Sequence, residues 1–132
     1  MELSVVIPVY NEEENVEPLI GEIEVSLSAL GKSYEVIVVD DGSRDGTFLK
    51  LRQIHQRLPQ LKVIGLKRNF GQTAALAAGL AHAQGDVVIL MDGDAQNDPA
   101  DIPAIQWFLS ATPLRRSRYT RTAHSDVKLR KA

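Results

Sequence analysis

Four short apolar segments, separated by stretches with helical periodicity, constrain the fold of this chain more than any other feature. Residues 3–9, 34–39, 61–66 and 86–91 are apolar over most of their length and do not alternate with polar residues. Such segments are typical of strands that are buried on both faces of a parallel sheet. Because predicted helices separate them, we expect an α/β fold, in which helices flank a parallel four-stranded sheet.

The predicted helices differ in their patterns. Val16, Ile20, Ile23 and Leu27 form one apolar stripe, and residues 45–59 and 73–83 supply the second and third helices. Three glutamates follow Asn11, where they would face the positive end of a helix dipole. We therefore expect Asn11 to cap the first helix.

Length and composition fit one soluble domain. The chain has 132 residues, 44% of them hydrophobic, and no cysteine, so it has neither disulfides nor thiolate metal sites. Its longest apolar segments are too short to span a bilayer, and Met1 is not followed by the pattern of a secretory signal. We expect a cytoplasmic location and no nucleic-acid partner.

The charges are unevenly distributed along the chain. Residues 1–112 contain 16 acidic and 8 basic side chains, whereas residues 113–132 contain 7 basic side chains and one acidic one. Such a change marks either a functional basic tail or a segment whose origin differs from that of the preceding domain.

Polar clusters follow three of the predicted strands, at residues 8–12, 40–47 and 92–98. Ligands of parallel α/β sheets bind beyond the carboxyl ends of the strands. The clusters therefore predict a binding site at that end of the sheet.

The last cluster contains two aspartates separated by one glycine. Asp92 and Asp94 can converge on one divalent cation, Mg²⁺ or Mn²⁺, and Gln96 can add a carbonyl oxygen. The alternative is a polar turn. The position after a strongly apolar strand favours the metal site.

The other polar residues have two interpretations each. Asp40 and Asp41 can accept hydrogen bonds from a nucleobase or a ribose, or they can belong to a turn before the next helix. Lys67 and Arg68 can screen a diphosphate, or they can be solvated surface charges. Around the end of the first strand, the candidates for a nucleoside pocket, or for a strand exit and helix cap, are Pro8, Tyr10, Asn11 and Glu12.

Four segments occur in the order PVYNEEENV, VIVVDDGSRDGT, RNFGQTAALAAGL and DVVILMDGDAQNDP. Together they resemble family 2 glycosyltransferases, in particular the branch of dolichol-phosphate mannose synthase, over about residues 3–106. The resemblance implies a Rossmann-like GT-A fold and inverting transfer from GDP-mannose or a UDP-sugar to a polyprenyl (dolichyl or undecaprenyl) phosphate. It also implies a nucleoside pocket lined by Pro8, Tyr10, Glu12, Asp40 and Asp41, and a donor metal held by Asp92, Asp94 and Gln96.

Beyond about residue 107 the sequence has no recognised counterpart in this family. We expect residues 1–107 to form the nucleotide-sugar-binding part and residues 108–132 to be a basic tail, disordered or aberrant after truncation or a frameshift. A native tail that binds anionic lipid at the inner face of the membrane is the alternative. A sheet that ends at its fourth strand would expose an edge, which favours self-association.

The region that would supply a catalytic base is missing from this pattern, so we assign no catalytic residue. An inactive nucleotide-binding fragment is therefore the alternative function. A dinucleotide-binding oxidoreductase is disfavoured because no G-x-G-x-x-G motif follows the first strand. An aspartyl-phosphate phosphotransferase is disfavoured because the first strand ends without an aspartate.

Overall fold

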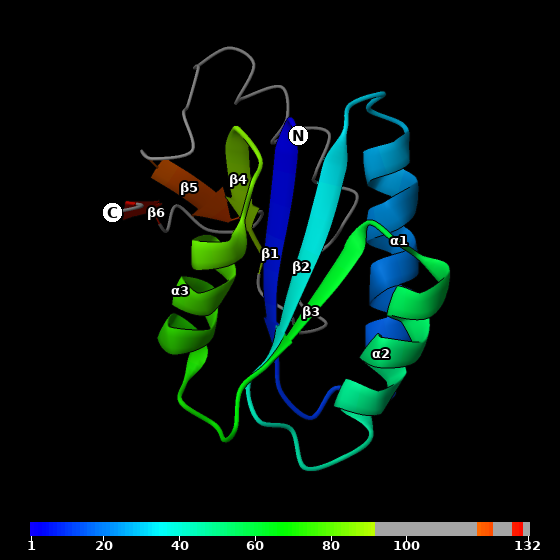
Figure 1. The fold of residues 1–132 in the computed structure, drawn as a ribbon, viewed down its shortest axis with the longest axis vertical. Helices are drawn as coiled ribbons and strands as arrows, with labels where there is room; N and C mark the ends of the chain where they lie inside the picture. Colours follow the sequence, from blue (N-terminus) through cyan, green and yellow to red (C-terminus); the bar gives the residue numbers. More distant parts are fainter. Residues whose placement is uncertain (92–118, 123–127, 131–132) are drawn as a thin grey trace.

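A computed structural model describes residues 1–91, 119–122 and 128–130. Strands and helices alternate through the first 90 residues, as the apolar pattern predicts, and two further short strands follow (Figure 1). The strands and helices, in chain order, are β1 (Leu3–Val9), α1 (Val16–Ser28), β2 (Tyr34–Asp40), α2 (Thr47–Arg57), β3 (Leu61–Gly65), α3 (Gln72–His82), β4 (Val87–Leu90), β5 (Tyr119–Thr122) and β6 (Lys128–Arg130).

The strands form one sheet in the order β3-β2-β1-β4-β5-β6. The first four of these are parallel, which confirms the predicted four-stranded parallel sheet. The expectation that the sheet ends at the fourth strand is wrong, because β5 pairs with β4 in parallel and β6 pairs with β5 in antiparallel orientation. Both added strands come from the segment expected to be a tail. The division of the chain at residue 107 remains a prediction.

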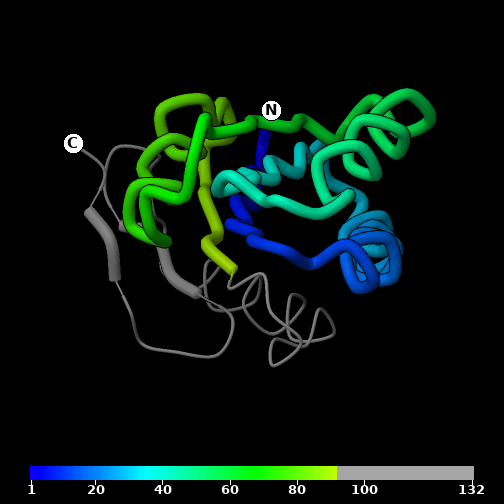
Figure 2. The backbone as a smooth tube through the Cα atoms, turned by 90° about the horizontal axis from the view of Figure 1, so that it is seen from below, coloured from blue at the N-terminus to red at the C-terminus, as the bar shows by residue number. Residues whose placement is uncertain are grey.

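Helices cover both faces of the sheet. In Figure 1 α3 lies on one side of the strands and α1 and α2 lie on the other, and Figure 2 shows the same separation from below. The face toward α1 and α2 packs side chains such as Val5, Ile7 and Val38 against Ile23 and Leu51. The face toward α3 has smaller partners, and its buried residues are Val6, Ile37, Val39, Ala75, Ala83, Val88 and Leu90. Burial on both faces explains why the strands are apolar throughout.

Close packing of α3 depends on a glycine. A Cβ atom at Gly79 would lie 2.3 Å from Cγ1 of Val6 and 3.2 Å from Cγ2 of Val39. Any larger residue at this position would therefore hold the helix away from β1 and β2.

Pro8 lies within β1, a central strand, although proline cannot donate a hydrogen bond to a sheet. The pairing of β1 with β4 ends at Val6 and Leu90. The carbonyl oxygen of Val6 accepts a hydrogen bond from the Met91 N–H, on the β4 side. The carbonyl oxygen of Val9 accepts one from the Asp41 N–H, on the β2 side. Because the backbone polar groups of successive strand residues point to opposite sides, the nitrogen of Pro8 faces the β4 side, like those of Val6. Pro8 lies beyond the last residue of β1 that pairs with β4, so no N–H is needed there.

The first helix begins later than expected. Asn11 does not cap it, because α1 starts at Val16, with Asn15 as the capping residue. The carbonyl oxygen of Glu12 accepts hydrogen bonds from the N–H groups of Asn15 and Val16, at 3.0 and 2.9 Å. A turn therefore separates β1 from α1. No helix in the described part of the chain is long and apolar enough to cross a membrane.

A buried polar network joins the strands at their amino ends. Glu35 is 1% exposed, and its Oε2 accepts hydrogen bonds from the Ser4 hydroxyl at 2.5 Å and the Gln84 N–H at 2.7 Å. Oε1 is 2.6 Å from Nζ of Lys62 and has no other partner among the described residues. The Ser4 hydroxyl oxygen in turn accepts a hydrogen bond from the Gly85 N–H at 2.8 Å. The network ties β1, β2 and β3 to the α3–β4 connection.

Candidate functional site

Three loops leave the carboxyl ends of neighbouring parallel strands, at the lower end of Figure 1. The first loop comprises residues 10–15, the second loop residues 41–46 and the third loop residues 66–71. We call the three loops together the rim. Ligands bind at this end of a parallel α/β sheet, so the rim is the candidate site.

Asp40 ends β2 and joins the first two loops. It is 3% exposed, and its Oδ1 accepts hydrogen bonds from the Ser43 N–H, at 3.1 Å, and from the Ser43 hydroxyl. The Ser43 hydroxyl oxygen accepts a hydrogen bond from the Asn11 N–H at 2.8 Å, and Oδ1 of Asn11 accepts one from the Arg44 N–H at 2.9 Å. Asn11 has a φ of 51°, a left-handed conformation that asparagine tolerates well. The Asn11 side chain therefore links the first loop to the second.

A second set of contacts fixes the start of α2 against the first loop. Oδ1 of Asp45 accepts hydrogen bonds from both the N–H and the hydroxyl of Thr47, and Oδ2 accepts one from the Glu13 N–H. Burial alone would raise the pKa of Asp45, but these hydrogen bonds outweigh it and lower the pKa. The Thr47 hydroxyl also accepts a hydrogen bond from the Glu12 N–H at 3.0 Å. Asp45 and Thr47 thus hold the turn before α2 against the first loop.

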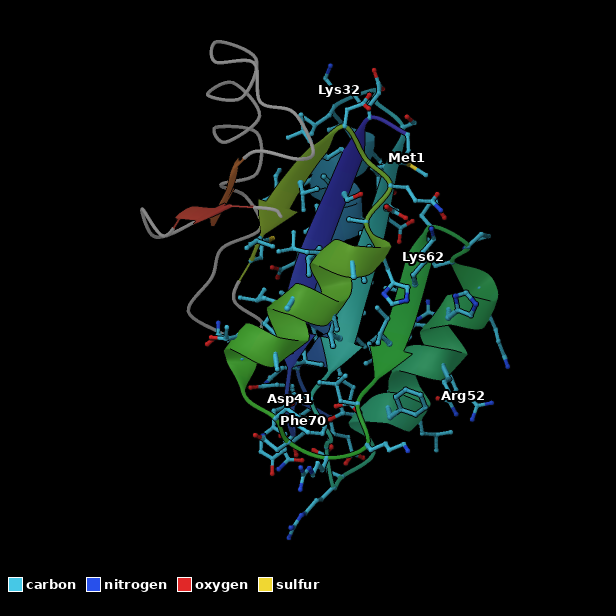
Figure 3. The ribbon with its side chains drawn as sticks, turned by 60° about the vertical axis from the view of Figure 1, so that its left-hand side comes forward. Met1, Lys32, Asp41, Arg52, Lys62 and Phe70 are labelled. Atoms are coloured by element: carbon cyan, nitrogen blue, oxygen red, sulfur yellow. The ribbon has the colours of Figure 1, made fainter. Side chains whose placement is uncertain are left out.

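Asp41 joins the second loop to the third. It is 4% exposed; Oδ1 accepts a hydrogen bond from the Phe70 N–H at 2.8 Å and Oδ2 accepts one from the Gly71 N–H at 3.0 Å. Figure 3 shows Asp41 and Phe70 next to one another below the strands. Both oxygens of this carboxylate are thus used to hold the backbone of the third loop.

The third loop presents cations and an aromatic ring. Lys67 and Arg68 are exposed, and the guanidinium carbon of Arg68 lies 4.7 Å from the centroid of the Phe70 ring, within the range of a cation–π interaction. Phe70 is 51% exposed and Tyr10, in the first loop, is 40% exposed. Exposed aromatic rings therefore occur on the first and third loops, and exposed cations occur on the third loop and, at Arg44, on the second.

The predicted nucleoside and diphosphate residues that the structure describes come from three segments, residues 8–12, 40–41 and 67–68. All three segments meet at the rim. Tyr10, Asn11, Lys67 and Arg68 are exposed there, whereas Glu12 is half-buried and accepts a hydrogen bond from the Asn15 side chain at 2.8 Å. Three of the predicted residues are buried: Pro8, Asp40 and Asp41. The predicted metal ligands Asp92, Asp94 and Gln96 lie outside the described residues. Within the described ranges no group of three acidic or histidine side chains could hold a metal ion.

Sequence reasoning missed the parts played by Ser43 and Phe70. Ser43 follows two aspartates and a glycine, which is a turn signal with a side-chain hydrogen bond as its mechanism. Phe70 follows two cations closely, and an aromatic residue in that position is the available signal for a cation–π contact.

The fold and the rim define an α/β domain with a candidate ligand site beyond the carboxyl ends of its parallel strands. The chain belongs to glycosyl transferase family 2, whose sequence profile matches residues 4–129. The match extends past residue 106, where the resemblance seen in the sequence ends.

Two relatives share a type of acceptor in their names. The chain is 43% identical over 106 residues to a dodecaprenyl-phosphate galacturonate synthase from Rhizobium johnstonii, covering 80% of this chain and 31% of that one. It is 44% identical over 105 residues to an undecaprenyl-phosphate 4-deoxy-4-formamido-L-arabinose transferase from Edwardsiella ictaluri, covering 78% and 32%. The chain therefore spans about a third of the length of these relatives. The predicted resemblance to enzymes of polyprenyl-phosphate sugars is confirmed, whereas neither relative is named for mannose.

Solved structures agree with this assignment. S. aureus TarS in complex with UDP-GlcNAc matches with a TM-score of 0.63 and 30% identity, over 84% of this chain and 32% of that chain. The mannosyltransferase PcManGT from Pyrobaculum calidifontis, in complex with GDP-Man and Mn²⁺, matches with a TM-score of 0.60 and 29% identity, over 85% and 33%. The predicted Rossmann-like GT-A fold is confirmed.

Proposed function

We propose that this chain contributes the donor site of a glycosyltransferase, which binds a nucleoside-diphosphate sugar and transfers the sugar with inversion to a polyprenyl phosphate. Membership of the family and the two relatives named for polyprenyl-phosphate sugars support the proposal. The donor is GDP-mannose or a UDP-sugar, since one similar structure holds each kind of nucleotide sugar.

The arrangement of the rim carries the proposal. The buried carboxylate of Asp40 ends β2, and the exposed cations of Lys67 and Arg68 follow the neighbouring strand β3 at the same end of the sheet. A carboxylate can accept a hydrogen bond from a base or ribose, an aromatic ring such as Tyr10 can stack on the base, and cations can screen the diphosphate. The rim therefore offers a group for each part of a nucleoside diphosphate: the base, the ribose and the diphosphate.

A divalent metal, Mg²⁺ or Mn²⁺, is the proposed cofactor. Asp92, Asp94 and Gln96 would hold it, as oxygen ligands suit both ions. When bound, such an ion neutralises negative charge on the departing diphosphate. The Mn²⁺ and GDP-Man in the similar mannosyltransferase structure support this part of the proposal.

The proposed reaction is a single displacement. An oxygen of the acceptor phosphate forms a bond to the anomeric carbon while the bond from that carbon to the diphosphate oxygen breaks. A phosphate monoester has a second pKa of about 6 and is largely ionised at neutral pH, so the acceptor itself needs no strong base. Because a polyprenyl phosphate lies in a membrane, we propose that the protein works peripherally at the inner, cytoplasmic membrane face.

Calorimetric titration with UDP and GDP, each with and without Mn²⁺, tests the donor site. We expect one of the two to bind, more tightly with Mn²⁺, and Asp40→Asn to weaken binding about 10-fold to 100-fold, the value of a hydrogen bond to a charged group. Asp86→Asn is the matched control, because Asp86 is an exposed aspartate at the opposite end of the sheet. Asp94→Ala should remove the effect of Mn²⁺. Absence of binding to both nucleotides under all conditions would refute the proposal.

A further inference from the structure

The third loop is held in place mainly by one side chain. Leu66 packs against the core at the start of the loop, but residues 67–70 are all exposed, so apolar burial does not fix the rest of the loop. Its N–H groups at positions 70 and 71 donate to Asp41, at 2.8 and 3.0 Å, and the Leu66 N–H donates to the carbonyl oxygen of Asp40 at 2.9 Å. Within the described part of the chain, the N–H groups of residues 67–69 have no partner. The carboxylate of Asp41 therefore supplies the hydrogen bonds that hold the far end of the loop.

The residue after Asp41 lies directly beneath the same loop. A Cβ atom at Gly42 would be 2.2 Å from the carbonyl carbon of Arg68 and 2.5 Å from the backbone nitrogen of Asn69. Gly42 also has a φ of 73°, a conformation that favours glycine. Asp41 and Gly42 together thus form the surface on which the third loop rests.

The contact continues from the loop backbone to the Arg68 side chain. The backbone N–H of Phe70 is one of the two that Asp41 holds, and the ring of Phe70 lies 4.7 Å from the guanidinium carbon of Arg68. A cation–π contact restricts a long side chain that is otherwise free at the surface. The position of the guanidinium therefore depends on the buried carboxylate through Phe70.

We infer that Asp41 is a positioning residue: its carboxylate orders the third loop and, through Phe70, fixes Arg68 for the diphosphate of the donor. The inference rests on the proposed donor site. It differs from the expectation that Asp41 contacts the nucleoside itself, because both oxygens of Asp41 already accept a backbone N–H. The hydrogen bonds of Asp40, in contrast, use Oδ1 alone among the described residues.

Amide hydrogen exchange, followed by NMR without any ligand, tests the first half of the inference. We expect Asp41→Ala to speed exchange at Phe70 and Gly71 by about 10-fold or more, with the amides of β1 unchanged. Asp41→Asn, which keeps one acceptor oxygen and disturbs the fold less, should speed exchange at one of the two amides. Asp45→Ala removes a rim carboxylate that does not touch the third loop, so it should change neither. Wild-type exchange at both amides in both Asp41 variants would overturn the inference.

A double-mutant cycle tests the second half. Kd for the nucleoside diphosphate is measured for the wild type, Asp41→Ala, Arg68→Ala and the double variant. If Asp41 acts through Arg68, the double variant should bind within about twofold of Arg68→Ala, because residues that act as one unit are not additive. Losses that multiply would show that Asp41 contacts the ligand independently and would overturn the inference, with the donor site intact. If the wild type binds no nucleotide, the proposed function fails, and hydrogen exchange still decides whether Asp41 holds the loop.

Discussion

Nζ of Lys62 lies 2.6 Å from Oε1 of Glu35, an ion pair that joins β3 to β2 at the end of the sheet opposite the rim. The Glu35 side chain is 1% exposed and the Lys62 side chain is 40% exposed. Burial alone would raise the pKa of Glu35, but Lys62, Ser4 and the Gln84 N–H outweigh it and lower the pKa. The carboxylate is therefore ionised in the folded protein and contributes to its stability.

This pair predicts a loss of stability in acid. Because the folded-state pKa of Glu35 lies below the unfolded-state value of about 4.3, its contribution is fully present above that value. It is lost as the pH falls through the lower, folded-state pKa. Urea unfolding of the wild type and Glu35→Gln, measured between about pH 3 and pH 7, should show a steeper acid loss in the wild type.

At neutral pH Glu35→Gln should lower the free energy of unfolding by about 1–3 kcal/mol, the cost of weakened hydrogen bonds to a buried charged group. Lys62→Met is the complementary variant. It leaves Glu35 buried without its cation, so the folded-state pKa of Glu35 should rise toward the unfolded-state value. The protein should then be less stable at neutral pH and lose less stability in acid than the wild type. An identical pH dependence in all three proteins would show that the pair does not contribute.

At Gly79, alanine would be favoured by helix propensity but disfavoured by packing against β1. Alanine is favoured over glycine in a helix by about 1 kcal/mol, but the new methyl group would lie 2.3 Å from Cγ1 of the buried Val6. We expect Gly79→Ala to destabilise the protein by about 1–3 kcal/mol in urea unfolding. Gly21→Ala in α1, where nothing lies within 4 Å, is the control and should stabilise by about 0.5–1 kcal/mol. Equal effects at both sites would contradict the predicted close packing of α3.

Replacing Gly42 should weaken nucleotide binding in addition to lowering stability through its left-handed backbone conformation. Gly31 and Gly42 have φ values of 67° and 73°, but only Gly42 has a neighbouring backbone in the space of a Cβ atom. Gly31→Ala should therefore cost about 1–2 kcal/mol of stability, with nucleotide affinity unchanged. Gly42→Ala should displace Arg68 and weaken nucleotide binding as well, measured by calorimetry. Unchanged affinity in a folded Gly42→Ala variant would refute this prediction.

The sequence predicted the layers of the fold well because burial on both faces leaves a strong apolar signal. β1 to β4 and α3 lie within about one residue of the expected positions and α2 lies within two, with the start of α1 as the exception. That start was misplaced because Asn11 has the residue type of a helix cap but is held by Ser43, which is distant in sequence. Local propensity cannot register a contact of this kind.

The strands β5 and β6 were missed for a related reason. Tyr119–Thr122 and Lys128–Arg130 are short and polar, so neither has the apolar pattern that predicts a strand. Their assignment depends on pairing with β4 and with each other. At the site, the candidate residues that the structure describes gather at the rim as predicted, and Asp92, Asp94 and Gln96 lie outside the described residues. The sequence did not predict that Asp41 uses both oxygens on the loop of Phe70.

Variants of Phe70 measure how much its cation–π contact with Arg68 contributes to nucleotide affinity. Phe70→Leu keeps an apolar side chain of similar size but removes the aromatic face, which lies 4.7 Å from the guanidinium carbon. An exposed cation–π contact is worth about 0.5–1 kcal/mol, so nucleoside diphosphate binding should weaken about 2-fold to 5-fold. Phe70→Tyr keeps the ring and should bind like the wild type. Both variants keep the backbone N–H that donates to Asp41, so a loss of affinity in Phe70→Leu alone would come from the aromatic ring. An equal loss of affinity in both variants would contradict this origin.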